Sequence, residues 1–197
     1  MRHPLEITPD IYRKRLFFTF LFLTLSLFAV FRVLDQPLQT PAAPNGIVSF
    51  ELAGGPLRAQ EITGEWKRMP LLLSSVAGQA NPEIVNIQYV FAAFGLGIDY
   101  LFMPVYALAL GFGTLLAAGR HGGWFKSLGA VAGYGAFAAA LFDAVENYAL
   151  FLILLNRLYS PYPEIAYYCA SIKFSLLIFG LLYSVTGWLL PQKIMNA

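Results

Sequence analysis

Two carboxylates and an amide at helical spacing are the residues of this sequence best placed for chemistry. Asp143, Glu146 and Asn147 lie in an apolar stretch from Leu128 to Leu155 that is long enough to cross a bilayer. Spacings of three and four residues put the three side chains on nearly one face of a helix. Carboxylates at membrane depth are costly and usually face a bundle interior at functional positions. The same face carries small residues that permit close helix packing: Gly129, Ala132, Ala136 and Ala140.

Two other apolar stretches carry further polar groups at a similar depth. Counted at 1.5 Å per residue from the outer helix ends, Asp99 and Lys173 lie at about 12 Å, Glu146 at about 14 Å and Asp143 at about 18 Å. Lone charges at that depth cost about 2.5–3.5 kcal/mol each, so we expect them to pair. The predicted polar core comprises Asp99, Tyr106, Asp143, Glu146, Asn147 and Lys173.

The same positions predict how the core is assembled. Tyr106 is placed to donate its hydroxyl to a carboxylate. Lys173 shares a helix face with small residues, including Gly180 and Gly187, and we expect this face to dock against the stretch that holds Asp143. Three acids and one base in low dielectric should leave at least one carboxyl protonated.

Three roles for this core remain open. It is a structural ion-pair network that fixes helix register, or a proton, cation or small-ligand site, or a docking or cofactor-binding surface in a larger membrane complex. In the second case an intramembrane enzyme or transporter would use Glu146 or Asp143 as the proton acceptor beside Lys173. Neither a cofactor nor a catalytic activity can be assigned from these residues.

The composition indicates an integral membrane protein. The chain has 197 residues, of which 58% are hydrophobic and 12% charged, whereas soluble domains carry roughly 25% charged residues. We predict a single all-α domain, a four-transmembrane-helix bundle whose first partner is the lipid bilayer. The predicted spans cover about residues 16–34, 90–118, 125–156 and 165–190. The first could also be a signal peptide, but its apolar core is longer than usual and lacks a clear cleavage site.

The outer loop, residues 35–81, is the only sizeable part outside the predicted spans. Residues 47–52 could form a short strand or an interfacial helix. Pro56 favours a helix through Arg68, which either lies flat on the membrane or packs as a cap over the bundle. Residues 69–80 should form an irregular connector, and the cap-type residues Asn81, Pro82 and Glu83 predict a helix start.

Charge and residue types exclude several classes of function. A net charge of +2 with no basic stripe argues against nucleic acid as a partner. The single cysteine, Cys169, excludes an internal disulfide and a Cys-x-x-Cys motif. His3 and His121 lie outside the predicted spans, so an intramembrane haem or zinc site lacks its histidine ligands and we predict no metal.

Basic residues near the spans predict the orientation. Seven lie on one side, including the cluster Arg13-Lys14-Arg15, and five on the other. Because cytoplasmic loops carry the excess of Lys and Arg, we expect both termini in the cytoplasm.

Several short motifs resemble a family of small four-span bacterial inner-membrane proteins of unassigned function. They are residues 46–53, Arg58-Ala59-Gln60, Trp66, residues 99–102 with Tyr106, Asp143-x-x-Glu146-Asn147, Ser171-x-Lys173-Phe174 and residues 180–183. The resemblance covers about residues 46–190 without the connector at 69–82. It implies a bacterial inner-membrane location but no reaction, and a membrane-protein partner or a homo-oligomer is compatible with it.

Overall fold

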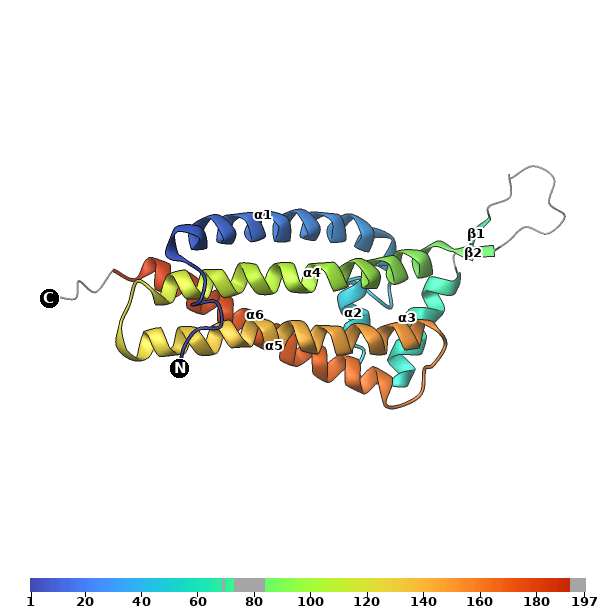
Figure 1. Ribbon diagram of the computed structural model, residues 1–197. Helices are drawn as coiled ribbons and strands as arrows, with labels where there is room; N and C mark the ends of the chain where they lie inside the picture. Colours follow the sequence, from blue (N-terminus) through green and yellow to red (C-terminus); the bar gives the residue numbers. More distant parts are fainter. Residues whose placement is uncertain (69, 73–83, 192–197) are drawn as a thin grey trace, which may run out of the picture. The chain divides into compact units, whose positions relative to one another are not determined.

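The computed structural model describes residues 1–68, 70–72 and 84–191, and these are almost entirely helical (Figure 1). Four helices are long and apolar enough to cross a membrane. They are α1 (Asp10–Asp35), which continues into the short helix η1 (Gln36–Leu38), α4 (Ile87–Ala118), α5 (Gly123–Leu154) and α6 (Tyr162–Leu189). The four predicted helices are therefore present. α1 begins before its basic cluster because Asp10 suits the positive end of the helix.

The loop between α1 and α4 also forms regular structure. Its elements are α2 (Ile47–Glu51), α3 (Pro56–Arg68), β1 (Pro70–Leu72) and β2 (Ile84–Asn86). The segment that could have been strand or helix is thus helical, and the helix predicted after Pro56 is confirmed. The two strands pair antiparallel, with Leu71 opposite Val85.

This strand pair corrects two predictions. Part of the connector expected to be irregular is strand β1, and α4 begins at Ile87, directly after β2. The predicted helix start at residues 81–83 itself lies outside the described residues. β-branched Ile84 and Val85 favour an extended backbone, which outweighs the capping signal just before them.

The chain divides into two compact units, and α1, α4, α5 and α6 each supply a segment to both. Unit 1 comprises Met1–Phe28, Leu101–Ala144 and Ser171–Ala197, and unit 2 comprises Ala29–Tyr100 and Val145–Ala170.

In unit 1, α1 lies alongside α4, and glycines allow close packing (Figure 1). Phe20 stacks on Phe112 with ring centroids 6.3 Å apart. A Cβ atom at Gly113 would approach the Phe17 ring to 3.2 Å, so glycine makes room for α1 there.

In unit 2, the helices of the loop pack on the long helices as a cap. Phe50, Ile62 and Trp66 are completely buried, in one apolar cluster with residues of α4, α5 and α6. The Trp66 indole N–H donates to the Leu38 carbonyl oxygen at 2.9 Å. The apolar face of α3 is therefore covered by protein, and of the two predicted arrangements the packed cap is the one found.

Aspartate at the end of α1 fixes the entry to this cap. Asp35 Oδ1 accepts a hydrogen bond from the Ile47 N–H, at the first turn of α2, at 2.7 Å. Gly46, just before it, has φ of 57°, and a Cβ at this position would collide with the Asp35 carboxylate.

Candidate functional site

Asp143 on α5 joins three helices in unit 1. Lys173 Nζ on α6 donates to Asp143 Oδ1 at 3.0 Å and forms an ion pair with it. The Tyr106 hydroxyl on α4 donates to Asp143 Oδ2 at 2.8 Å. Each carboxylate oxygen therefore has a partner on a different helix. The hydrogen bond expected from Tyr106 to a carboxylate is present.

This ion pair is removed from solvent. Asp143, Lys173 and Tyr106 are 2%, 5% and 6% exposed. The Lys173 ammonium also lies 4.7 Å from the centroid of the Phe174 ring, whose face attracts a cation. Charge-assisted bonds in such an apolar setting are stronger than in water, and a charge left alone there is correspondingly costly.

Small residues bring the helix backbones of unit 1 together, as the sequence predicted for α5. Ala132 and Ala136 have no exposed surface, and a Cβ at Gly129 would collide with the Tyr183 side chain and with Ala118. The small-residue face of α6 was predicted to dock on α5. Its glycines contact both neighbouring helices: Gly180 faces Leu110 of α4, and Gly187 faces Ala117 of α4 and Phe125 of α5.

A second buried polar group lies in unit 2, on Asn147 of α5. Its Nδ2 donates to Asp99 Oδ2 at 2.8 Å and to the Leu96 carbonyl oxygen at 3.3 Å, both on α4. Because both partners are acceptors, they fix which way the amide is turned. Asn147 Oδ1 is buried and has no hydrogen-bond partner among the described residues.

The remaining predicted residue, Glu146, belongs to unit 2 and is completely buried. The structure thus brings Tyr106, Asp143 and Lys173 together in unit 1 and Asp99 and Asn147 together in unit 2. Glu146 shares with Asn147 the buried face of its segment of α5.

His3 is buried, although the sequence predicted only that it lies outside the membrane spans, in the N-terminal segment. The N-terminal segment crosses the long helices of unit 1 before α1 begins (Figure 1). His3 is 7% exposed, and its Nε2 lies 3.0 Å from Thr114 Oγ1, whose hydroxyl donates to the Gly111 carbonyl oxygen. The Leu5 N–H donates to Nδ1 at 3.1 Å. Nε2 therefore carries the proton, and the ring is neutral with both nitrogens satisfied.

The environment of His3 opposes protonation. Burial lowers its pKa from 6.5 to about 4, while Glu6 raises and Arg13 further lowers that pKa. Gly133 on α5 makes room for the ring, since a Cβ there would collide with it. Gly133 lies far from His3 in the sequence, so the spacing of residues could not predict this contact.

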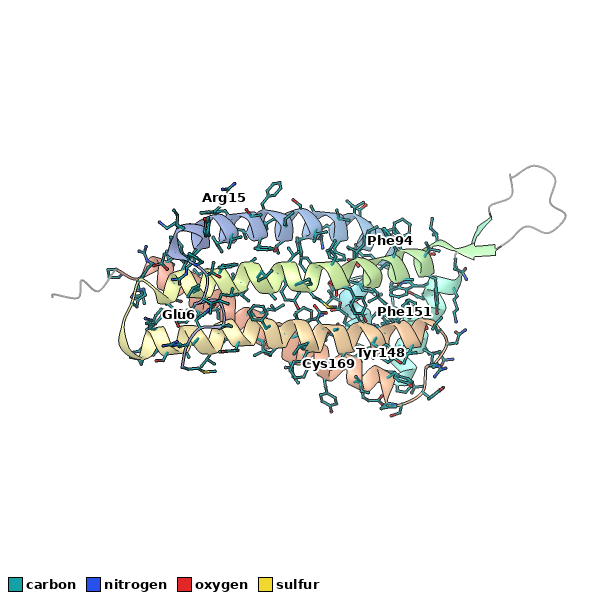
Figure 2. The ribbon with its side chains drawn as sticks, in the orientation of Figure 1. Glu6, Arg15, Phe94, Tyr148, Phe151 and Cys169 are labelled. Carbon is teal, nitrogen blue, oxygen red and sulfur yellow. The ribbon has the colours of Figure 1, made fainter. Side chains whose placement is uncertain are left out.

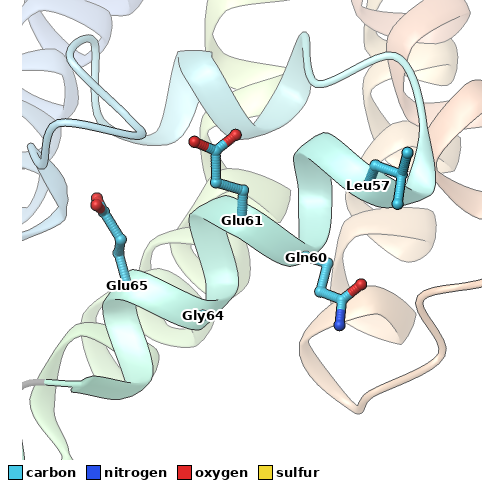
Figure 3. Close-up of a pocket in the computed structure, with 5 residues that line it drawn as sticks. All are labelled: Leu57, Gln60, Glu61, Gly64 and Glu65. Atoms are coloured by element: carbon cyan, nitrogen blue, oxygen red, sulfur yellow. The ribbon is translucent and has the colours of Figure 1, made fainter.

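An open hollow on α3 is lined by Leu57, Gln60, Glu61, Gly64 and Glu65 (Figure 3). Both of its carboxylates are bonded to other residues of the loop. Glu61 pairs with Arg58 at 2.5 Å, and Glu65 Oε2 accepts from the Ala42 N–H at 2.8 Å. Both carboxylates of the hollow are thus bonded within the loop itself, so we do not treat the hollow as a candidate functional site.

Within the described residues, no group of three His, Cys, Asp or Glu side chains could hold a metal ion. Comparison of the chain with protein families, with curated proteins and with solved structures finds no match. A function must therefore be argued from the residues of this chain and their geometry.

Proposed function

We propose that this chain is a multi-pass membrane protein whose buried ion pair is structural and fixes the packing of its membrane-spanning helices. The helices supply the length and apolar surface that a bilayer requires. Apolar side chains that stay exposed, among them Phe94, Tyr148 and Phe151 of unit 2, would then face lipid (Figure 2).

The observation that carries the proposal is that both oxygens of Asp143 are engaged by other helices. A carboxylate that must abstract a proton or bind a ligand needs an accessible oxygen with a proton-accepting lone pair. Here Lys173 neutralises the charge and Tyr106 occupies the second oxygen, so the group is arranged to join α4, α5 and α6.

The location and orientation belong to the same proposal. The resemblance noted in the sequence supports the bacterial inner membrane, and the basic residues support cytoplasmic termini. Apart from Lys173 inside α6, the sequence of unit 1 carries seven basic residues, against five in unit 2. Unit 1 would therefore hold the cytoplasmic helix ends.

A double-mutant cycle on Lys173→Met and Asp143→Asn tests the structural role. Each single change leaves one partner of a buried pair without its counter-charge, which should lower the free energy of unfolding by about 3–5 kcal/mol. The double variant removes both charges, so its loss should be well below the sum of the two single losses. Thermal or denaturant unfolding of the detergent-purified chain measures all three.

Lys126→Met is the matched control, because Lys126 is exposed in the same unit and its removal should change stability by no more than about 0.5 kcal/mol. Additive losses in the double variant, or single variants as stable as the control, would contradict a structural ion pair.

We propose a second candidate function, a proton or small-ligand site in unit 2. It is favoured by the buried, unpartnered Oδ1 of Asn147, because such an acceptor costs free energy unless a donor fills it. In this candidate Glu146 carries the proton. The infrared spectrum of the unmodified chain should then show a carboxylic-acid band that is missing from the spectrum of Glu146→Gln. A band that persists unchanged in Glu146→Gln, or its absence from the unmodified chain, argues against this candidate.

A further inference from the structure

The turn between α4 and α5 carries a guanidinium group, that of Arg120, for which the described residues supply no acceptor at Nε. Arg120 lies over the Trp188 ring of α6, with its Cζ atom 5.2 Å from the ring centroid. Its Nε is buried and has no hydrogen-bond partner among the described residues. An arginine offers five N–H donors in a planar fork that matches phosphate. The contact with the Trp188 ring positions this fork at the end of α6.

The surroundings of Arg120 in unit 1 are basic and aromatic. The start of α1, the α4–α5 turn and the end of α6 lie at one end of this unit (Figure 1). The Nε2 atom of His121, in the turn, lies 2.8 Å from the carbonyl oxygen of Gly187 on α6. This contact joins the turn to the end of α6. Lys126 on the first turns of α5 is exposed, and Trp124 beside it is 76% exposed.

Further cations of the same unit stand on α1. Lys14 and Arg15 are exposed, and Arg15 projects away from the helix into the surroundings (Figure 2). Arg13, in contrast, is occupied by Asp10 and by the backbone carbonyls of Glu6 and Thr8. Unit 1 as a whole has a formal charge of +5, against −3 for unit 2. This end therefore combines cations that have no acidic partner among the described residues with tryptophans, which prefer the headgroup level of a bilayer.

We propose that this end of unit 1 is a binding site for the headgroup of an anionic phospholipid, with Arg120 as the phosphate-binding residue. Lys126 adds charge beside it, and Trp188 and Trp124 pack along the glycerol and upper acyl region. Clusters of basic residues at the cytoplasmic ends of membrane helices attract anionic lipids, by about a factor of five in affinity for each cation near the surface. The inference rests on the membrane placement proposed above and adds to it a specific ligand class.

Lipid titration of the delipidated, detergent-purified full chain, followed by native mass spectrometry, tests the site. Phosphatidylglycerol should bind more tightly than phosphatidylcholine, and raising the salt concentration should weaken only the former. Arg120→Gln should weaken phosphatidylglycerol binding about fivefold or more. Arg157→Gln is the matched control, because Arg157 is exposed and belongs to unit 2; it should bind as the unmodified chain does.

Three results would overturn the proposal: equal binding of the two lipids, equal losses for Arg120→Gln and Arg157→Gln, or full displacement of phosphatidylglycerol by inorganic phosphate. The last would indicate a site for a free anion. If Arg120→Gln does not fold, Lys126→Gln replaces it, since an exposed side chain can be changed without loss of the fold, and normal binding by that variant contradicts the site. This assay uses purified protein and does not depend on the orientation in the membrane. The membrane placement is tested separately, by labelling in cells.

Discussion

At the scale of single residues, Asp143 and His3 show two ways in which this chain keeps polar groups inside an apolar interior. Asp143 forms an ion pair with Lys173, and the Tyr106 hydroxyl donates to its second oxygen. His3 is held neutral, and its two nitrogens are satisfied by Thr114 and the Leu5 backbone. Both arrangements satisfy the buried group, so each is disrupted by removing a partner or changing a protonation state.

The burial of His3 predicts a specific dependence of stability on pH. Its pKa is lowered to about 4 in the folded chain from an ordinary value of 6.5, so the unfolded chain binds the extra proton first as the pH falls. The free energy of unfolding should therefore be highest above pH 6.5 and decrease between about pH 6.5 and pH 4, by at most about 3 kcal/mol from this group.

Thermal unfolding of the detergent-purified chain across this pH range measures the effect. His3→Gln should remove this component of the pH dependence, and His121→Gln, the control at the only other histidine, should retain it. If the His3→Gln variant follows the unmodified chain at every pH, His3 does not anchor the N-terminal segment.

At the scale of elements, the cap of unit 2 depends on the connection between α1 and α2. Asp35 at the end of α1 bonds to the first turn of α2, and Gly46 adopts a positive φ beside it. A side chain at Gly46 would be strained by the backbone and would collide with Asp35.

Gly46→Ala should therefore lower the free energy of unfolding by about 1–3 kcal/mol. Gly55→Ala is the control, because no atom lies within 4 Å of a Cβ at Gly55, and it should be close to neutral. Limited proteolysis of the α2–α3 segment and thermal unfolding both report the difference. Equal stability of the two variants would show that the Asp35 contact does not hold the cap.

The elements also show what the sequence could and could not predict. The long apolar helices, the helix after Pro56, and the pairing of Asp143 with Lys173 follow from local composition, capping residues and the cost of burying charge. Three features did not follow. Residues 84–86 form strand β2 where a helix was expected to continue, the glycines of α6 contact α4 as well as α5, and His3 folds back onto Thr114. Each depends on contacts between segments distant in sequence, which periodicity along one segment does not contain.

At the scale of the whole molecule, the energetics of every buried charge depend on the solvent that surrounds the four long helices. Their exposed apolar side chains would be a liability in water and are ordinary against lipid. The proposed orientation rests on the basic residues near the helix ends, which are more numerous in the sequence of unit 1 than in that of unit 2.

Cysteine labelling in spheroplasts tests this placement most directly. In a Cys169→Ser background, single cysteines replace exposed residues at Ile7, Gln60, Gly122 and Tyr159. A membrane-impermeant maleimide should label the cysteines at Gln60 and Tyr159 in intact spheroplasts. It should label those at Ile7 and Gly122 only after the membrane is permeabilised. Equal labelling of all four positions before permeabilisation, or the reverse pattern, would contradict a four-span protein with cytoplasmic termini.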